Sequence, residues 1–237
     1  MRPLGILLTG DPVPRARALR GSFADMIRTT AGDAWTGRWL ELDARSAVPW
    51  PELAALIVTG SSASVTERAP WMLEAEARLR ALVTAGTPVF GICFGHQLLG
   101  QALGGRVAVN PRGRQIGTVE AELLGEDALL DAGRRPFRVN TSHRDVVSEL
   151  PPGARVLGRT PRDPHAFLRF GERVFGVQSH PEFDAVTMRA YIEERREILG
   201  AEGFDVEALL AGVDDAVPGA SILKRFVASV ARAPAMG

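Results

Sequence analysis

The sequence predicts an α/β fold with a mostly parallel central sheet flanked by helices. Short apolar runs that end in glycine, as buried parallel strands do, alternate with helical patterns along the first half of the chain. The second half changes to short alternating segments, which predict a small antiparallel β portion followed by a C-terminal helical extension. The 237 residues are enough for one sizeable core.

Three strands and one helix are expected within residues 4–86. "LGILLTG" (4–10) and "ALIVTG" (55–60) are apolar and end in glycine, and "RWLEL" (38–42) alternates. Apolar residues then recur at helical spacing over 69–86, with a proline near the first turn and Gly86 at the end. This order favours strands that run parallel, because each helix carries the chain back across the sheet.

A further strand and helix surround the only cysteine. "TPVFGI" (87–92) is a predicted buried strand, and "GHQLLGQALGG" (95–105) is a predicted helix that ends in two glycines. Cys93 therefore lies at the carboxyl end of a central strand, where open α/β sheets place their functional sites.

The second half supplies the expected antiparallel strands. Alternating patterns predict strands at 114–124, 137–140 and 154–160, and a hairpin over 166–178 that turns at Gly171–Glu172.

Helical patterns return at the end of the chain. One helix is expected over 185–200, and the tail from 205 onwards suggests two more. We therefore divide the chain into one domain, 1–200, and a helical extension, 201–237, packed on the same domain.

Composition excludes several function classes. Acidic and basic residues balance at 28 each, so no field of one sign predicts binding to nucleic acid or to an anionic membrane. No stretch approaches the roughly 20 apolar residues of a membrane span. One cysteine forms no internal disulfide and no cysteine-based metal cluster, so we expect a cytoplasmic protein.

The pentapeptide "GICFG" around Cys93 fits G-x-C-x-G, the thiol counterpart of the nucleophile elbow. A residue on a sharp strand-to-helix turn needs small neighbours two positions away, here Gly91 and Gly95. The helix that follows favours a negatively charged sulfur, and the N–H of Phe94 can donate to an oxyanion. The alternative from these residues alone is a buried cysteine that acts as a small hydrophobe.

A thiol nucleophile needs a base and a group that orients the base. His180 follows a predicted strand, and Glu182 lies two residues beyond it across Pro181. Both side chains can turn towards one site, so Glu182 can hold the imidazole tautomer. The alternative is a surface turn that carries both residues incidentally.

The two motifs together resemble the class I, triad-type glutamine amidotransferases. "PVFGICFGHQLLGQALGG" (88–105) precedes "VFGVQSHPEF" (174–183) in the order of that family, and 142–160 resembles the intervening segment of the GMP synthase branch. The likeness extends roughly over 56–183 and implies a flavodoxin-like α/β fold. It implies no metal and no organic cofactor.

The resemblance also implies residue roles. These are the nucleophile Cys93, the general base and acid His180, the orienting carboxylate Glu182, the substrate contact Gln97, and the oxyanion-hole segment Gly60, Ser61 and Phe94.

Ser142, His143 and Arg144 fall in the segment that holds the amino-acid end of the substrate in relatives. Two departures stand out: residues 59–62 read Thr-Gly-Ser-Ser where relatives often carry Ser-Gly-Gly-Pro, and Arg144 replaces a usual glycine. Arg144 can contact a carboxylate, narrow the pocket or remain a solvated charge.

The implied reaction is hydrolysis of the glutamine side-chain amide through a γ-glutamyl thioester, with ammonia passed to a partner. The chain ends about fifty-five residues after Glu182 and carries no phosphate-binding G-x-x-x-x-G-K-[ST] motif, so a synthetase is expected on a separate chain or not at all. One alternative is a free-standing hydrolase of γ-glutamyl peptides or amines. Another is a non-catalytic domain, against which the intact Cys, His and Glu argue.

Overall fold

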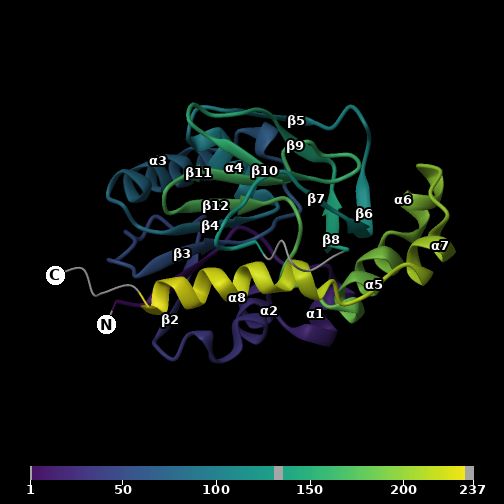
Figure 1. Ribbon diagram of the computed structural model, residues 1–237, viewed down its shortest axis with the longest axis horizontal. Helices are drawn as coiled ribbons and strands as arrows, with labels where there is room; N and C mark the ends of the chain where they lie inside the picture. Colours follow the sequence, from purple (N-terminus) through teal and green to yellow (C-terminus); the bar gives the residue numbers. More distant parts are fainter. Residues whose placement is uncertain (1, 131–135, 233–237) are drawn as a thin grey trace.

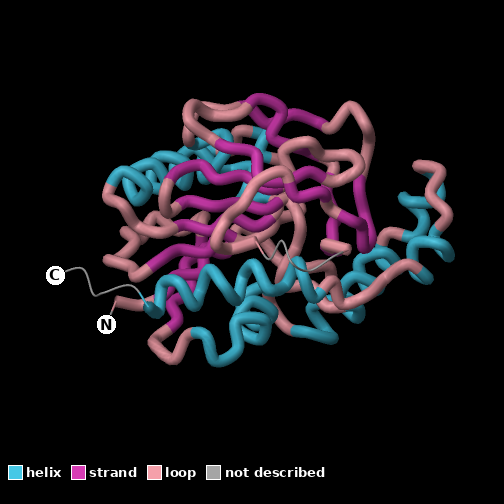
Figure 2. Tube along the Cα trace, in the orientation of Figure 1, coloured by secondary structure: helices cyan, strands magenta, loops and turns pink. Residues whose placement is uncertain are grey.

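The computed structural model describes residues 2–130 and 136–232. Figure 1 shows a sheet between two layers of helices, and Figure 2 shows the strands gathered in the centre with helices on both sides. The predicted α/β architecture is therefore confirmed.

The main sheet of the described residues has eight strands in the order β2-β1-β3-β4-β12-β11-β10-β7. Five of them are parallel: β2 (Trp39–Asp43), β1 (Leu4–Leu8), β3 (Ala55–Val58), β4 (Val89–Ile92) and β12 (Val174–Val177). Three antiparallel strands extend it: β11 (Phe167–Gly171), β10 (Arg155–Arg159) and β7 (Glu122–Leu123). The strand that leads to Cys93 is thus in the middle.

The helices cover both faces because the central strands are apolar on both sides. Within β3, Ala55 and Ile57 join one core cluster and Leu56 and Val58 join the other, as strand alternation requires. The first cluster includes residues of α2 (Phe23–Ala31) and α8 (Val217–Arg232), and the second includes residues of α3 (Pro70–Thr84) and α4 (Phe94–Ala102). Helix α4 begins at Phe94 and is buried along nearly all its length.

Two features of the second half differ from the prediction. The segment 114–124 is two strands, because β6 (Gln115–Glu120) pairs with β8 (Arg138–His143) whereas β7 pairs with β10. An alternating pattern does not reveal such a change of partner at Ala121. The hairpin β11–β12 is confirmed, with its turn one residue later, at Glu172–Arg173.

Four elements were not predicted. They are α1 (Pro14–Arg20), α2, β5 (Arg106–Val109) and β9 (Asp145–Glu149). Strands β5 and β9 form a two-stranded antiparallel sheet that lies against α4. Two short 3-10 turns occupy Gly32–Ala34 and Val65–Glu67.

The predicted helix over 185–200 is interrupted. Helix α5 (Ala185–Glu194) is followed by Arg195, whose φ of −109° and ψ of 13° are not helical, and α6 (Arg196–Ala201) begins directly after that residue. Helix α7 (Val206–Ala211) and α8 follow, so both predicted tail helices form. Figure 1 shows α6 and α7 projecting from the body. The division into 1–200 and 201–237 stays a prediction, and 233–237 lie outside the described residues.

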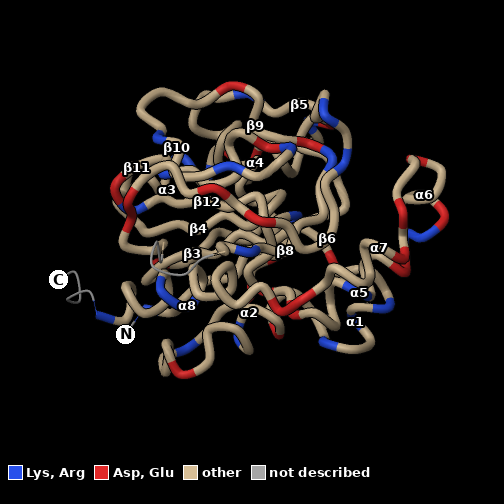
Figure 3. Tube along the Cα trace, turned by 45° about the vertical axis from the view of Figure 1, so that its right-hand side comes forward, with Lys and Arg blue, Asp and Glu red and all other residues tan. Residues whose placement is uncertain are grey.

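Charged residues of both signs are interspersed over the elements, as Figure 3 shows. Within the described ranges, no helix combines the length and apolar character that a bilayer crossing requires. The same residues contain no group of three or more His, Cys, Asp and Glu side chains arranged to hold a metal ion.

Candidate active site

Cys93 sits on a strained turn between β4 and α4. Its φ of 50° and ψ of −101° lie outside the regions that a non-glycine residue normally adopts. A Cβ on Gly91 would lie 2.6 Å from the carbonyl oxygen of Gly95, and a Cβ on Gly95 would lie 2.4 Å from that of Val58. The two glycines therefore permit the close backbone packing that presents the sulfur at the end of the sheet.

His180 and Glu182 follow β12, the neighbour of β4 in the sheet. The imidazole Nδ1 lies 2.8 Å from Oε1 of Glu182, and both side chains are almost fully buried. The ring stacks on Phe183 with centroids 4.0 Å apart, and Phe23 stacks at 6.5 Å. These contacts fix the imidazole plane, with Glu182 on one nitrogen.

The electrostatics couple His180 to Cys93. Burial alone lowers the pKa of His180, but the charges of Glu182 and Cys93, and hydrogen bonds to both side chains, raise this pKa to about 10. The imidazole is therefore held as a cation between a carboxylate and the sulfur.

Gln178 also contacts the sulfur and was not singled out from the sequence. Its Nε2 lies 3.5 Å from Sγ of Cys93, and its Oε1 accepts a hydrogen bond from Gln97 at 3.0 Å. Gln97 also donates to the carbonyl of Asp145, so both of its N–H groups are used and its oxygen remains available to a ligand. Gln178 lies inside the quoted "VFGVQSHPEF" motif, and this position is the sequence signal that could have identified it.

Two residues that line the cleft beside Cys93 have a backbone N–H without a partner. In the described part of the chain, neither Ser61 nor Phe94 donates its backbone N–H to any acceptor. The Ser61 hydroxyl instead donates to the Thr9 carbonyl at 3.0 Å. Gly60 lies against the imidazole of His180, since a Cβ there would lie 3.0 Å from Cε1 of His180.

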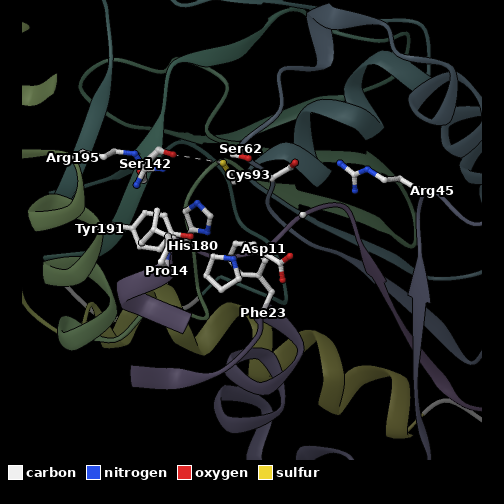
Figure 4. Close-up of a pocket in the computed structure, with 14 residues that line it drawn as sticks. Asp11, Pro14, Phe23, Arg45, Ser62, Cys93, Ser142, His180, Tyr191 and Arg195 are labelled. Carbon is white, nitrogen blue, oxygen red and sulfur yellow. Dashed lines mark hydrogen bonds between the residues drawn. The ribbon is translucent and has the colours of Figure 1, made fainter. Parts of the chain in front are cut away.

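Cys93 lies where two chambers of the cleft meet, each of about 450 Å³. Ser61, Ser62, Cys93, Ser142 and Arg195 line both chambers. The chamber that contains His180, here called the His180 chamber, is further lined by Gly10, Asp11, Pro12, Val13, Pro14, Phe23, Arg45 and Tyr191 (Figure 4). The other, here called the Gln97 chamber, contains Phe94 and Gln97.

The three residues of the predicted substrate-binding segment all line the Gln97 chamber. The carbonyl of Ser142 lies 3.9 Å from the Cys93 sulfur, and His143 is buried with Nδ1 3.1 Å from the Asp145 carbonyl. Arg144 is exposed at the rim. The residues quoted from the sequence thus come together at one place, whereas Arg195, Tyr191 and the loop after β1 were missed.

The sequence model of the family described as "Glutamine amidotransferase class-I" matches residues 42–197. The chain belongs to this family. Among class-I glutamine amidotransferases, the GMP synthase [glutamine-hydrolyzing] of Aeropyrum pernix is 39% identical over 169 residues, which make up 70% of this chain and 30% of that protein. This chain therefore spans less than a third of that relative.

Two further comparisons cover more of the other protein. A glutamine amidotransferase-like protein of Schizosaccharomyces pombe is 24% identical over 209 residues, 81% of this chain and 84% of that one. A glutamine amidotransferase from Thermotoga maritima superposes with a TM-score of 0.70 at 21% identity, covering 98% of this chain and 97% of that one. These likenesses extend the shared fold over nearly the whole chain.

Glu182→Gln is expected to change the pH dependence of the protein. The pKa of His180 is about 10 when folded and 6.5 for the free side chain, so its contribution to the free energy of unfolding is complete below pH 6.5 and is lost as pH rises through 10. Without the carboxylate charge this pKa falls. The pH at which kcat/KM for glutamine declines on the alkaline side is therefore expected to be lower by ~1 pH unit or more. The decrease in Tm from pH 6.5 to pH 10 is expected to be smaller in Glu182→Gln than in the unmodified protein.

The matched control is Glu194→Gln, which removes an exposed carboxylate of helix α5. Its kcat/KM profile and its Tm against pH should overlay those of the unmodified protein. A Glu182→Gln profile that also overlays them would contradict the coupling of Glu182 to His180.

Proposed function

We propose that this class-I glutamine amidotransferase hydrolyses the side-chain amide of glutamine through Cys93, His180 and Glu182. The observation that carries the proposal is the imidazole held between the Glu182 carboxylate and the Cys93 sulfur, where the two chambers meet. A charged sulfur with an adjacent imidazolium is ready both to attack a carbonyl and to protonate a leaving amine.

The proposed first half-reaction forms a thioester. The Cys93 thiolate attacks the γ-amide carbon, and the free N–H groups of Ser61 and Phe94 stabilise the oxyanion. The imidazolium of His180 then donates its proton to the departing nitrogen, the C–N bond breaks and ammonia leaves. In the second half-reaction a water gives a proton to His180 and attacks the thioester, which releases glutamate and the thiolate.

The glutamyl end of the substrate is proposed to occupy the Gln97 chamber. The carbonyl oxygen must face Phe94, and the leaving nitrogen must face His180, so the acyl chain extends to the remaining side of the sulfur. There the free oxygen of Gln97 can accept a hydrogen bond from the α-ammonium. Ser142, His143 and Arg144 surround the same space.

We further propose that ammonia is passed to a synthetase on a separate chain. The relatives named GMP synthase [glutamine-hydrolyzing] support an ammonia acceptor, because that name joins glutamine hydrolysis to a synthase. A second candidate is hydrolysis of γ-glutamyl compounds with a larger amine, and the volume of the His180 chamber favours it.

Steady-state turnover of glutamine by the isolated protein tests the proposal. We expect glutamate and ammonia in equal amounts, with Cys93→Ala as the blank, because the thioester route yields one of each. Glutamate production that persists in the blank would contradict the assignment of the nucleophile.

A further inference from the structure

The geometry at Cys93 determines where the amine part of a substrate must lie. His180 protonates the leaving nitrogen, so any substituent on that nitrogen continues into the His180 chamber. Phe94 and Gln97, which the proposed function assigns to the oxyanion and the glutamyl end, line the other chamber. The sulfur thus separates an acyl side from an amine side.

The amine side is far larger than ammonia requires. The His180 chamber has a volume of about 450 Å³, which is within the range of pockets that hold small organic ligands. Its walls are partly apolar: two residues of the loop after β1, the first residue of α1 and two aromatic side chains. These residues are Pro12, Val13, Pro14, Phe23 and Tyr191. They suit an apolar group attached to the leaving nitrogen.

Arg195 lines both chambers and brings to the His180 chamber a guanidinium without a hydrogen-bond acceptor. No acceptor among the described residues bonds its guanidinium, and its Nη1 is shielded from solvent without a partner. The guanidinium instead lies 4.7 Å from the centre of the Tyr191 ring. Figure 4 shows the side chain extending towards Ser142, above Tyr191 and His180. A cation in this state lacks the anion that normally accompanies a desolvated charge.

The other charges of the His180 chamber already have partners. Arg45 donates to the Thr9 carbonyl at 3.0 Å and lies 4.3 Å from the centre of the Trp71 ring. The acidic side chain of the chamber, Asp11, forms an ion pair with Arg17 at 2.7 Å. Among the described side chains of this chamber, Arg195 is therefore the cation whose guanidinium has no hydrogen-bond acceptor.

The interruption between α5 and α6 places this arginine. Because Arg195 leaves the helical conformation, α5 ends beside the cleft and α6 continues in the projecting arm. Its neighbour Arg196 points elsewhere and pairs with Glu193 and Glu207. Two adjacent arginines thus have different surroundings, which provides a matched control.

We propose that Arg195 binds a carboxylate on the leaving amine, so that the substrates of this site include γ-glutamyl amides of apolar amino acids. The inference rests on the proposed function, since it uses the same triad and the same acyl side. The γ-amide C–N bond breaks, His180 gives its proton to the nitrogen, and the free amino acid leaves. The γ-glutamyl thioester is then hydrolysed by water to glutamate.

Binding to Cys93→Ala protein tests the inference without requiring turnover. Titration calorimetry compares γ-glutamyl-leucine with γ-glutamyl-leucinamide, which has the same shape and no carboxylate. We expect the acid to bind about tenfold more tightly or better, as for a charge-assisted hydrogen bond. In Cys93→Ala/Arg195→Gln this ratio should fall to about one, and in Cys93→Ala/Arg196→Gln it should be unchanged.

Because both ligands carry the same glutamyl group, the ratio of their affinities in one protein is independent of how a substitution affects binding of that group. Equal affinities for acid and amide in Cys93→Ala, no binding of either, or an unchanged ratio after Arg195→Gln, would each overturn the inference. Glutamine turnover by the wild-type protein reports separately on the proposed function. If the protein hydrolyses glutamine but binds the acid no more tightly than the amide, only the inference is refuted. If it prefers the acid but its turnover does not depend on Cys93, only the proposed chemistry is refuted.

Discussion

Cys93→Ala is expected to lower kcat for glutamine hydrolysis by ~10⁴-fold or more. In the proposed mechanism the loss is this large because the remaining groups have no nucleophile to serve: His180 exchanges protons with the sulfur and the leaving nitrogen, and Glu182 orients His180. The oxyanion donors at Ser61 and Phe94 are retained, so a small residual rate over water is expected. The measurement is glutamate release under saturating glutamine.

The same variant should fold normally. The Cys93 side chain is small and already lies at a cleft, so its removal leaves little cavity. Circular dichroism and Tm should resemble those of the wild-type protein. A Cys93→Ala protein that is folded and within tenfold of wild-type kcat would contradict the assignment of the nucleophile, and an unfolded Cys93→Ala protein would contradict the expectation that it folds normally.

Gly95→Ala is expected to destabilise the protein and disable the site. The added methyl would lie 2.4 Å from the carbonyl oxygen of Val58. The backbone fixes the positions of both atoms, so neither can rotate out of the contact. Helix α4 must therefore shift relative to β3, at a cost of ~1–3 kcal/mol or more in the free energy of unfolding. The shift displaces Cys93, so kcat should fall by ~10²-fold or more as well.

The control is Gly200→Ala in helix α6, where an added Cβ meets nothing within 4 Å. Alanine there should stabilise the protein by ~0.5–1 kcal/mol, because it reduces the entropy of the unfolded chain. Urea unfolding of both variants provides the comparison. Equal stability of Gly95→Ala and wild type would show that close packing at the elbow is not required.

The residues that meet at the candidate active site could be predicted from the sequence because their signals are local. Gly91 and Gly95 lie two residues on either side of Cys93, and His180 and Glu182 are separated by a single proline. The glycine pair allows the sharp turn at Cys93, and the short spacing of His180 and Glu182 keeps their side chains close. The strand pattern places both segments at the carboxyl ends of strands. The structure makes β4 and β12 neighbours, which brings the two motifs together.

The amine side of the cleft could not be predicted in the same way. Its walls come from the loop after β1, from α2, and from Tyr191 and Arg195 on either side of the end of α5. These residues are distant in the chain, and nothing local distinguishes Arg195 from the adjacent Arg196. Only packing shows that one lies in the cleft and the other pairs with Glu193 on the surface.

The antiparallel strands show a related limit. An alternating pattern indicates a half-buried strand but not its partner, so the change from β8 to β10 as partner within 114–124 left no sequence signal.

The most direct test of the proposed chemistry is mass spectrometry of the protein, acid-quenched during glutamine turnover. The account predicts a γ-glutamyl adduct on the peptide that contains Cys93, absent from Cys93→Ala. Turnover with no adduct at Cys93, or an adduct on another residue, would contradict it.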